Sequence, residues 1–540
     1  MKRSQAYIFL CLVTILLANL LIFSFFNHAF DDDEFQHVHI AWLLHHGYIP
    51  YKDFFEHHLV FYHRLTAPLF VFGENFRQIF FFRGISMISA AGALFLLYRC
   101  GRSFGFSPIA SGTGTWLLGI TPMFLLKMTE ARPEALAIFA FTGALSLMFA
   151  PARADSCRPG KSAESPEILT RRIQWKFIFI GLLAGAMALL SQKYVIAAGA
   201  LLAAIYFLNG WKPAVITASA FCASVAAYSG WMLAIGAGNN AFESVILLNL
   251  RWKYSFSPSG YFVELYTTAG ILFVTGVFGI LRALFQGHTR RQAFALATLL
   301  AGCLLQIFLV PVPYRQSFLP LLVILALGSM FFSASIFQLA TVVRRGWAIF
   351  AIPLLLGASS LAALPRQLSA DNRADISQMK EIAKFAPSGP VFDGRGLMFH
   401  RMHVGYHACM HHEILMMLDA DKYSEDVIRS LQDAGMPPVI RDYRVQKMPD
   451  MINSFISDNY LPSTIPGVLT AGLSRERLVP KKPEVMNIRA SGTWKATWRG
   501  GKFSIDGEPI VNGQIIILER GSHILVSENL SWDFRIERSY

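Results

Sequence analysis

The chain has 540 residues, of which 54% are hydrophobic and only 15% are charged. Soluble globular domains carry about 25% charged residues, so this composition excludes an ordinary soluble protein and predicts a polytopic α-helical membrane protein with a polar part attached. The net charge of +13 comes without a soluble basic domain or a basic stripe interleaved with aromatic residues, which argues against a nucleic-acid partner.

The N-terminus predicts the first membrane helix. Lys2 and Arg3 precede an apolar run over 7–26, about the 20 residues needed to cross a bilayer, and no small-residue cleavage site follows it. We therefore expect an uncleaved signal-anchor helix. Further apolar runs bring the expected number of spans to about eleven. They lie at 79–98, 107–126, 131–150, 177–191, 194–209, 213–236, 263–285, 293–311, 317–340 and 346–364, and the short pair near 177–209 could instead be kinked or re-entrant.

The charges between these runs predict the orientation in the membrane. If the N-terminus is cytoplasmic, every inside loop is basic, as at Arg99 and Arg290, whereas acids such as Glu130 and Glu264 fall on the other side. Lys and Arg favour cytoplasmic loops. We therefore expect an integral protein of the bacterial cytoplasmic (inner) membrane, with the N-terminus cytoplasmic and the C-terminal domain extracytoplasmic.

The pattern of polarity predicts two domains. Residues 1–365 hold the apolar runs, with a first outer loop at 27–78, and residues 366–540 are polar and mixed. Within the second part, 424–435 is typical of a short amphipathic helix closed by Gly435, and 437–443 of a strand. From about 484, polar and apolar residues alternate between glycine pairs, which predicts a β-rich end to an α/β-plus-β domain.

The most unusual stretch is FDDDEFQHVHIAWLLHHGYIPYKDFFEHH at residues 30–58. Asp31–Asp33 can cap a helix that carries Glu34 in its first turn and closes near Gly47. At about thirteen residues the helix is too short to span, so we expect it to lie along the outer membrane surface with its apolar side toward the lipid. A carboxylate there could act as general base on an incoming hydroxyl. The alternative is a set of solvated acids that only enforces topology.

Outer-face cations could complement such a base. A departing phosphate is best held by Arg or Lys. The candidates are Lys127, Arg132, Lys193, Arg251, Lys253 and Arg315. Each cation by itself could also be a simple interfacial anchor.

The residues 31–58 resemble the first outer loop of GT-C glycosyltransferases. The resemblance is to the bacterial branch related to protein O-mannosyltransferases (glycosyltransferase family 39) and to lipid A aminoarabinose transferase. "TEARPEALAIFAF" at 129–141, "LLAGAMALLSQKYV" at 182–195 and "VPVPYRQSFLP" at 310–320 are similar to later motifs of the same branch. The resemblance covers about residues 1–365, together with "VFDGRGLMFHRMHVGYH" beyond.

The resemblance implies an inverting glycosyltransferase that moves a sugar from a polyprenyl-phosphate-linked donor to an acceptor hydroxyl or amine on the extracytoplasmic face. It implies Asp33 of the Asp33–Glu34 pair as base, with the choice among Asp31, Asp32 and Asp33 left open, and Glu134 as the second acid. It implies Arg132, Lys193 and Arg315 as contacts of the carrier phosphate. Further candidate substrate-binding residues are Tyr314, Asp53, Glu56, His57 and His58.

The histidines leave the metal question open. Glu56, His57 and His58 are the best candidates for a divalent ion, but their spacing matches no zinc template and the residues could bind the acceptor instead. The expected partners are the lipid-linked donor, the membrane, and a glycan, lipid or protein acceptor. The alternative functions are a transporter or channel with an outer acidic vestibule, or a membrane scaffold. A transporter would place ionisable residues within its spans, and these spans are nearly free of them.

Overall fold

The computed structural model describes residues 3–150, 166–252, 255–287, 289–342, 347–407, 411–529 and 531–540. Lys253 and part of the inside loop after residue 150 lie outside these ranges. The chain forms two compact units. The helical unit is Met1–Phe30, His57–Leu69 and Arg77–Asn372, and the sheet unit is Asp31–Glu56, Phe70–Phe76 and Arg373–Tyr540. The acidic segment at 31–56 is therefore grouped with the C-terminal part of the chain rather than with the membrane helices.

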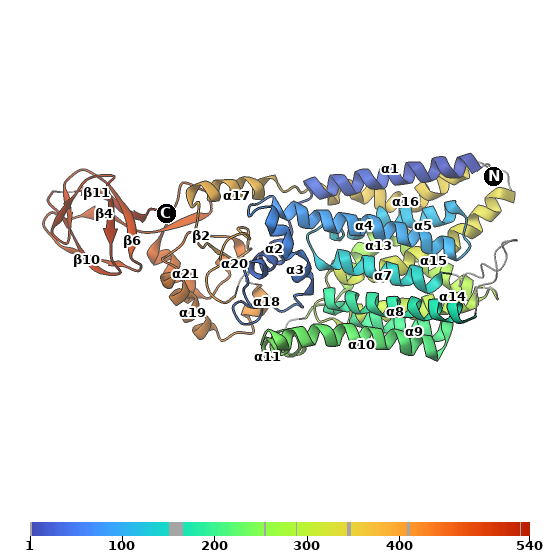
Figure 1. The fold of residues 1–540 in the computed structure, drawn as a ribbon. Helices are drawn as coiled ribbons and strands as arrows, with labels where there is room; N and C mark the ends of the chain where they lie inside the picture. The colour runs from blue at the N-terminus through green and yellow to red at the C-terminus, as the bar shows by residue number, and fades with distance from the viewer. Residues whose placement is uncertain are drawn as a thin grey trace. The chain divides into compact units, whose positions relative to one another are not determined.

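The helical unit is a bundle of apolar helices that run alongside one another (Figure 1). Among the described residues, 8 helices are long and apolar enough to cross a membrane. They are α1 (Arg3–Asn27), α4 (Gln78–Ser103), α9 (Val195–Asn209) with the preceding turn from Gln192, α10 (Trp211–Ala234), α13 (Ser259–Leu284), α14 (Arg290–Leu309), α15 (Leu319–Val342) with the preceding turn from Arg315, and α16 (Ala348–Gln367). Two further apolar helices are α7 (Pro133–Phe149) and α8 (Pro166–Leu190), so the expected polytopic helical fold is confirmed.

The expected span at 107–126 is not one helix. It is divided into α5 (Pro108–Gly119) and α6 (Pro122–Lys127). The residue before a proline is pushed out of the helical region, and Thr121, which precedes Pro122, has an extended ψ of 118°. Helix α6 therefore ends directly before the loop that leads to α7, and its last residue and this loop lie in the same part of the bundle.

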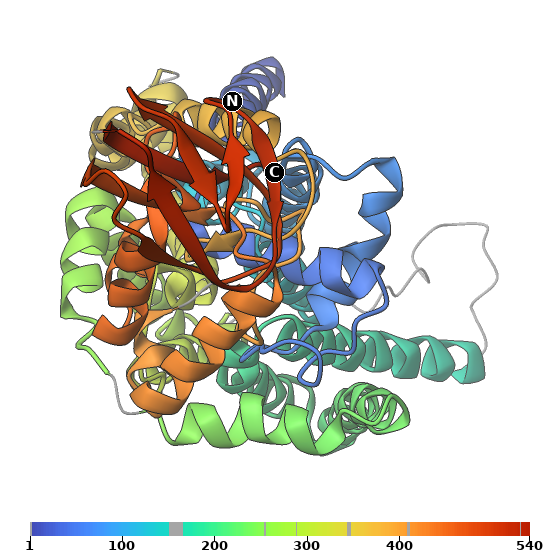
Figure 2. The same cartoon turned by 90° about the vertical axis from the view of Figure 1, so that its left-hand side faces the viewer.

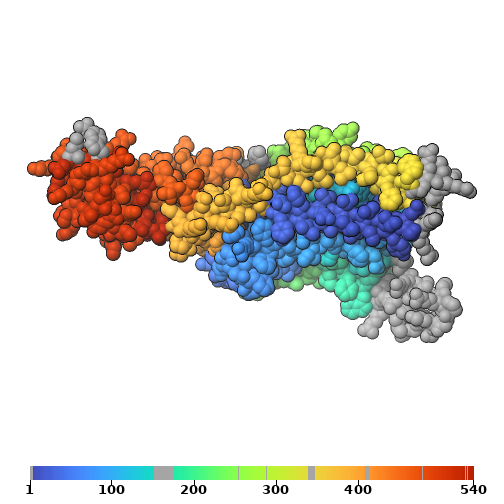
Figure 3. All heavy atoms as spheres, turned by 90° about the horizontal axis from the view of Figure 1, so that it is seen from above, coloured from blue at the N-terminus to red at the C-terminus, as the bar shows by residue number. Residues whose placement is uncertain are grey.

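Close helix packing relies on small residues and aromatic edges. A Cβ atom added at Gly279 of α13 would overlap the backbone of Gly328 in α15, so these two helices approach as only glycine allows. Helices α1 and α16 also lie side by side (Figure 3), and the ring centroids of Phe9 and Phe350 are 6.4 Å apart in an edge-on contact. Much of the apolar surface of α1 remains exposed, as expected for a lipid-facing helix.

The sheet unit contains helices α2 (Asp32–His45), α17 (Arg373–Phe385), α19 (Ala420–Asp433) and α21 (Asp450–Asn459), and two sheets. The larger sheet has the strand order β1-β2-β4-β11-β6-β9, with β3 paired to β4, and the smaller has the order β5-β10-β7-β8. Strands β1 and β2 are parallel and the other pairs are antiparallel. Figure 2 shows the strands of both sheets from a second direction.

The strand bounds follow the alternation of the sequence. The larger sheet comprises β1 (Phe392–Asp393), β2 (Val439–Ile440), β3 (Tyr460–Pro462), β4 (Val468–Leu478), β6 (Gly492–Arg499), β9 (Ile515–Leu518) and β11 (Ser531–Arg538). The smaller comprises β5 (Glu484–Ile488), β7 (Phe503–Ile505), β8 (Glu508–Ile510) and β10 (Gly521–Ser527). In β6, Trp494, Ala496 and Trp498 are buried at every second position, as a half-buried strand requires. The central strand β4 begins before residue 484.

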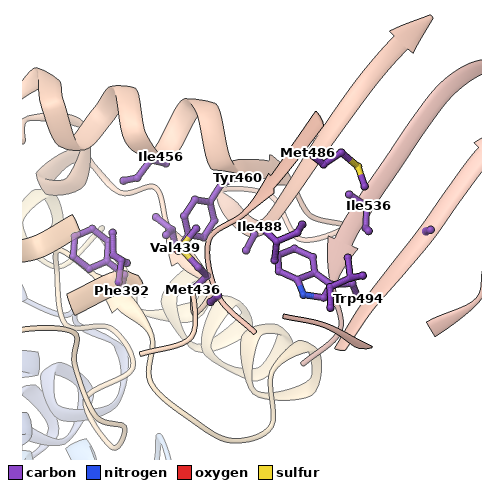
Figure 4. Packing of buried hydrophobic residues seen from close by; sticks show 14 of the residues in the cluster. Phe392, Met436, Val439, Ile456, Tyr460, Met486, Ile488, Trp494 and Ile536 are labelled. Atoms are coloured by element: carbon purple, nitrogen blue, oxygen red, sulfur yellow. The ribbon is translucent and has the colours of Figure 1, made fainter. Parts of the chain in front are cut away.

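A hydrophobic core joins the helices and sheets of this unit. Ile488, Trp494 and Ile536 from three strands lie in one buried cluster with Tyr460 and Met436 (Figure 4). The predicted helix at 424–435 is confirmed as the second part of α19, with Asp419 as N-cap and Gly435 at a positive φ of 79° just beyond its end. This core gives the loops around α17, β1 and α20 (Tyr443–Gln446) a fixed support.

Candidate functional site

The acidic segment forms the predicted helix with its predicted cap. Asp31 accepts a 3.0 Å hydrogen bond from the backbone N–H of Asp33, and Glu34 Oε1 accepts one of 3.0 Å from the N–H of Asp31. These reciprocal bonds make a capping box at the start of α2. Glu34 is completely buried and has a structural role in this cap. Its predicted catalytic role stays a prediction.

The predicted surface position of α2 is wrong. Every residue from Glu34 to Leu44 is buried, so the helix has no apolar face left for lipid. Within the sheet unit, the ring of Phe35 stacks on that of Phe399 with centroids 6.3 Å apart, and His39 Nδ1 lies 2.8 Å from the Phe399 carbonyl oxygen. The physical reason is that protein, not lipid, covers the helix on all sides.

Asp32 is held by three side chains from the C-terminal part of the chain. Its Oδ1 accepts a 2.7 Å hydrogen bond from Arg395 Nε, and its Oδ2 accepts one of 2.5 Å from the Tyr443 hydroxyl. Arg444 Nη2 lies 3.5 Å from Oδ2. With Asp31 engaged in the cap and Asp32 in this network, two of the three consecutive aspartates have assigned structural partners.

The loop that carries Arg395 is itself fixed by buried acids. The Arg395 guanidinium also contacts Asp375, at 3.0 Å, and its backbone N–H donates to Asp442, at 2.9 Å. Asp393 accepts from the backbone N–H groups of residues 395, 396 and 398. Burial, together with the nearby Asp442 carboxylate, raises the pKa of Asp393 to about 7. Around these residues lies a cavity of about 320 Å³ that Asp32, Arg441 and Tyr443 also line.

The histidines of this unit are mainly hydrogen-bond partners. His39 Nε2 lies 2.8 Å from His403 Nδ1, and burial lowers the pKa of His39 to about 4, so the ring is neutral at pH 7. His46 Nε2 lies 3.1 Å from Glu74. His411 Nε2 lies 2.5 Å from Gln36 Oε1. These contacts favour the interpretation of the histidines as polar packing around the acids.

The candidate substrate-binding residues at 53–58 have clear local roles. Asp53 accepts a 2.6 Å hydrogen bond from the backbone N–H of Ile49 and so closes a turn. Gln36 donates to Glu56 at 3.0 Å. Glu56, His57 and His58 follow one another in the chain, and each offers a possible metal-ligating atom within 4.8 Å of the others. Consecutive residues are brought close by the chain itself, so this proximity alone does not select a metal.

The helical unit contains a buried cluster of charges between α6 and α7. Lys127 Nζ donates to both carboxylate oxygens of Glu130 at 2.8 Å, and Arg132 lies 3.6 Å from Glu130 and 3.5 Å from Glu134. His28, just after α1, lies 3.5 Å from Glu130. All four charged residues of the 127–134 segment are at most 6% exposed. We call these residues, with His28, the 127–134 cluster.

The cations of the 127–134 cluster favour the ionised form of Glu130 despite its burial. Burial alone raises the pKa of Glu130, but Lys127, His28 and Arg132 outweigh it and lower this pKa well below its usual value of 4.5. Helix α7 begins at Pro133. The cation Arg132 lies immediately before its first turn, and Glu134 lies within that turn. Two buried cations and two buried acids thus balance each other closely, which is the only low-energy way to bury such charges.

Tyr194 links the backbone near two further predicted residues to this cluster. The Tyr194 hydroxyl donates a 2.7 Å hydrogen bond to the carbonyl of Gln316 and interacts with the charges of Arg132 and Glu134. Lys193 and Arg315 are the chain neighbours of Tyr194 and Gln316. Their parts in a common site with Arg132 and Glu134 stay a prediction.

Arg315 has a partner that the sequence did not reveal. Its Nε donates to Glu264 Oε1 at 2.8 Å, and its guanidinium lies 6.0 Å from the ring centroid of Tyr261. The predicted Tyr314 packs its ring against Phe256, with centroids 5.2 Å apart. Arg315 is 38% exposed, so it is the most accessible member of the ion pairs in this region.

Arg83 is a buried residue that the sequence analysis did not single out. It is completely buried near the start of α4 and donates to the carbonyl oxygens of Phe25, His28 and Ala29 at 2.9–3.2 Å, while its guanidinium lies 4.5 Å from the Phe30 ring centroid. It therefore fixes the chain where it leaves α1. An arginine inside an apolar run was the available signal, because a charge in such a run needs partners.

The two units define the class of the chain as a polytopic helical membrane protein with a C-terminal domain containing sheets. Its fold is shared with ArnT from Cupriavidus metallidurans. The ArnT structure bound to undecaprenyl phosphate matches with a TM-score of 0.56, and the apo structure with 0.58. Both matches cover 87% of this chain and 98% of ArnT at 14% sequence identity. The expected resemblance to the GT-C aminoarabinose transferase branch is therefore confirmed for the fold.

Other comparisons add little. The apo oligosaccharyltransferase of Archaeoglobus fulgidus matches with a TM-score of 0.48 over 74% of this chain and 64% of its own, at 14% identity. No family model matches the chain, and no curated protein matches it in sequence.

Proposed function

We propose that the chain is an inverting glycosyltransferase that uses a polyprenyl-phosphate-linked sugar and acts on the extracytoplasmic face of the bacterial inner membrane. The observation that carries the proposal is the 127–134 cluster, a buried set of cations and acids, on the fold of ArnT, which binds undecaprenyl phosphate. We take residues 1–365 as the membrane catalytic domain and 366–540 as the extracytoplasmic domain, with the N-terminus cytoplasmic.

The acceptor would be activated by Asp33. The resemblance of residues 31–58 to the GT-C branch favours Asp33 as the base, while Asp31 caps α2 and Asp32 is bound by Arg395. Asp33 takes the proton of the acceptor hydroxyl or amine as its oxygen or nitrogen attacks the anomeric carbon from the face opposite the carrier. The bond between that carbon and the phosphate oxygen breaks, and the polyprenyl phosphate leaves with the bonding electrons, so configuration inverts.

The leaving phosphate would be held by cations of the helical unit. Arg132, Lys193 and Arg315 supply positive charge, because a departing phosphate gains negative charge in the transition state. Tyr314 supports the Arg315 end, and Glu134 orients Arg132 at 3.5 Å. Asp53, Glu56, His57 and His58 are proposed acceptor contacts, and the last three are the residues that would hold a divalent ion if transfer requires one.

The test separates carrier binding from transfer. Purified protein in nanodiscs is given undecaprenyl phosphate, and binding is measured by native mass spectrometry. A panel of undecaprenyl-phosphate-linked sugars is then added with extracted envelope lipids, and release of undecaprenyl phosphate is followed. We expect Asp33→Asn to bind the carrier like wild type and to release none, and Arg441→Gln, which lies outside the proposed machinery, to keep transfer. Full transfer by Asp33→Asn would overturn the base assignment.

The alternative of a transporter or channel makes a different prediction. Such a protein moves substrate between the two sides of a sealed liposome without any carrier lipid. In the described part of the helical unit, the 127–134 cluster lies between α6 and α7 at helix ends, not along the middle of a span. Flux in liposomes that lack carrier lipid would favour the alternative.

A further inference from the structure

The start of α2 is attached to the C-terminal part of the chain through one side chain. Asp32, the first residue of α2, is bound by Arg395 at 2.7 Å, by the Tyr443 hydroxyl at 2.5 Å and by Arg444 at 3.5 Å. We propose that Arg395 and Arg444 are positioning residues of the transferase, which hold the first turn of α2, and with it Asp33, in the orientation that the base requires. This inference rests on the proposed function.

The geometry of the α-helix relates the direction of the Asp33 side chain to that of Asp32. Successive residues in an α-helix are separated by about 100° around the axis, so a turn whose Asp32 side chain is fixed also has a fixed direction at Asp33. Helix ends fray when nothing holds them. The capping box of Asp31 and Glu34 satisfies backbone N–H groups of this turn, but both of its members are local. The Asp32 contacts, together with the stacking of Phe35 on Phe399, tie this part of α2 to the C-terminal part of the sheet unit.

Arg395 has the rigidity that an anchor needs. Two of its guanidinium nitrogens contact Asp375, at 3.0 and 3.5 Å, while Nε is reserved for Asp32. Its backbone N–H donates to Asp442, and its guanidinium lies 5.6 Å from the ring centroid of Phe35, one turn along α2. A planar guanidinium with several fixed partners holds one geometry, which a lysine cannot reproduce.

Arg444 also acts on the first turn of α2 through its positive charge. Its side chain is only 8% exposed, and it interacts with the charges of both Asp32 and Asp33. A cation next to a carboxylate favours the ionised form, which is the form that accepts a proton. Loss of Arg444 should therefore do more than loosen the turn, because it should also shift the pH at which the base becomes active.

The experiment compares kcat, KM and the pH profile of transfer in Arg395→Gln, Arg395→Lys, Asp32→Asn and Arg444→Gln. Arg441→Gln is the matched control, because Arg441 lines the same cavity but does not contact Asp32. We expect kcat to fall about 100-fold in Arg395→Gln, as small misplacements of a reacting group do, with undecaprenyl phosphate binding unchanged. The fold-loss in the Arg395→Gln/Asp32→Asn double variant should be smaller than the product of the two single losses, since the two substitutions share the Asp32–Arg395 contact.

The readouts distinguish positioning from mere stability. Arg444→Gln should move the acidic limb of the kcat/KM profile to higher pH, whereas simple unfolding lowers the amplitude without moving it. Arg441→Gln should match wild type. An unchanged kcat in both Arg395→Gln and Asp32→Asn would overturn the inference and leave the proposed function intact. A wild-type protein that binds no undecaprenyl phosphate and transfers no sugar would instead overturn the proposed function, on which the inference rests.

Discussion

Asp32 Oδ1 accepts a 2.7 Å hydrogen bond from Arg395 Nε, although the two residues are 363 positions apart in the chain. The contact explains why residues 31–56 belong to the same compact unit as the C-terminal part of the chain. It also gives the C-terminal domain a part in the proposed reaction, because the turn that carries the base depends on arginines from that domain.

We expect Asp32→Asn to destabilise the protein. The variant leaves the positive charges of Arg395 and Arg444 with a neutral partner in a half-buried site, and hydrogen bonds to charged groups contribute about 1.5–3 kcal/mol. The melting temperature in detergent measures this loss. As a control, Arg499→Gln removes a pair with Asp533 whose side chains are 84% and 60% exposed, and it should change stability by less than about 1 kcal/mol. Equal melting temperatures for wild type and Asp32→Asn would contradict the prediction.

We expect Glu130→Gln to be costly at neutral pH and nearly harmless in acid. The folded-state pKa of Glu130 lies below its usual 4.5, so its ionised form stabilises the fold above that pH and the contribution is lost as the pH falls further. In Glu130→Gln, Lys127 and Arg132 stay buried together without the carboxylate that both of them contact. The melting temperatures of wild type and variant should therefore stay apart between pH 7 and about pH 4.5 and converge as the pH falls further toward about 2. A difference that stays constant below pH 4.5 would count against the assignment.

We expect Asp393→Asn to behave in the opposite way. Burial and Asp442 raise the pKa of Asp393 to about 7, so the folded state keeps a proton that the unfolded state loses near 3.8. Wild-type stability from this group therefore falls as the pH rises from about 4 to about 7. The neutral amide does not titrate, so its destabilising effect should be largest at pH 5 and smallest at pH 8. Melting curves of the wild type and Asp393→Asn at pH 5 and pH 8 test this prediction. Arg395, the other charged neighbour, is unchanged in both proteins.

We expect Arg83→Met to destabilise the helical unit by about 3 kcal/mol or more, because three buried carbonyl oxygens lose their donor. Arg83→Lys keeps the charge but lacks the planar guanidinium, so its melting temperature should lie between those of the wild type and Arg83→Met. The measurement is thermal unfolding in detergent at fixed lipid content. If Arg83→Met melts with the wild type, the carbonyl contacts do not secure the end of α1.

We expect Arg315 and Arg132 to differ in what they affect. The Arg315 pair with Glu264 is 38% and 16% exposed, so Arg315→Gln should leave the melting temperature nearly unchanged yet weaken undecaprenyl phosphate binding about tenfold. Arg132 is 3% exposed, and Arg132→Gln should lower both. Binding by native mass spectrometry and melting on the same samples separate the two effects. Undiminished binding in both variants would remove these arginines from the proposed phosphate site.

The sequence predicted those features whose cause is local. The cap of α2 follows from Asp31 with Glu34 three residues later, and the membrane helices follow from apolar runs. The break at Pro122 was missed because hydropathy is continuous across it. The coverage of α2 and the pairing of Asp32 with Arg395 were also missed, because no local pattern identifies a partner hundreds of residues away. Arg83 was overlooked although its place in an apolar run was a usable signal.

The measurement that tests the central claim most directly is release of undecaprenyl phosphate from an undecaprenyl-phosphate-linked sugar by wild type and Asp33→Asn in the same nanodiscs. We predict release and acceptor glycosylation by the wild type. We predict no release by Asp33→Asn, with undecaprenyl phosphate binding and melting temperature as in the wild type. Equal release by both proteins, or a wild type that neither binds undecaprenyl phosphate nor releases it from any donor, would contradict the account.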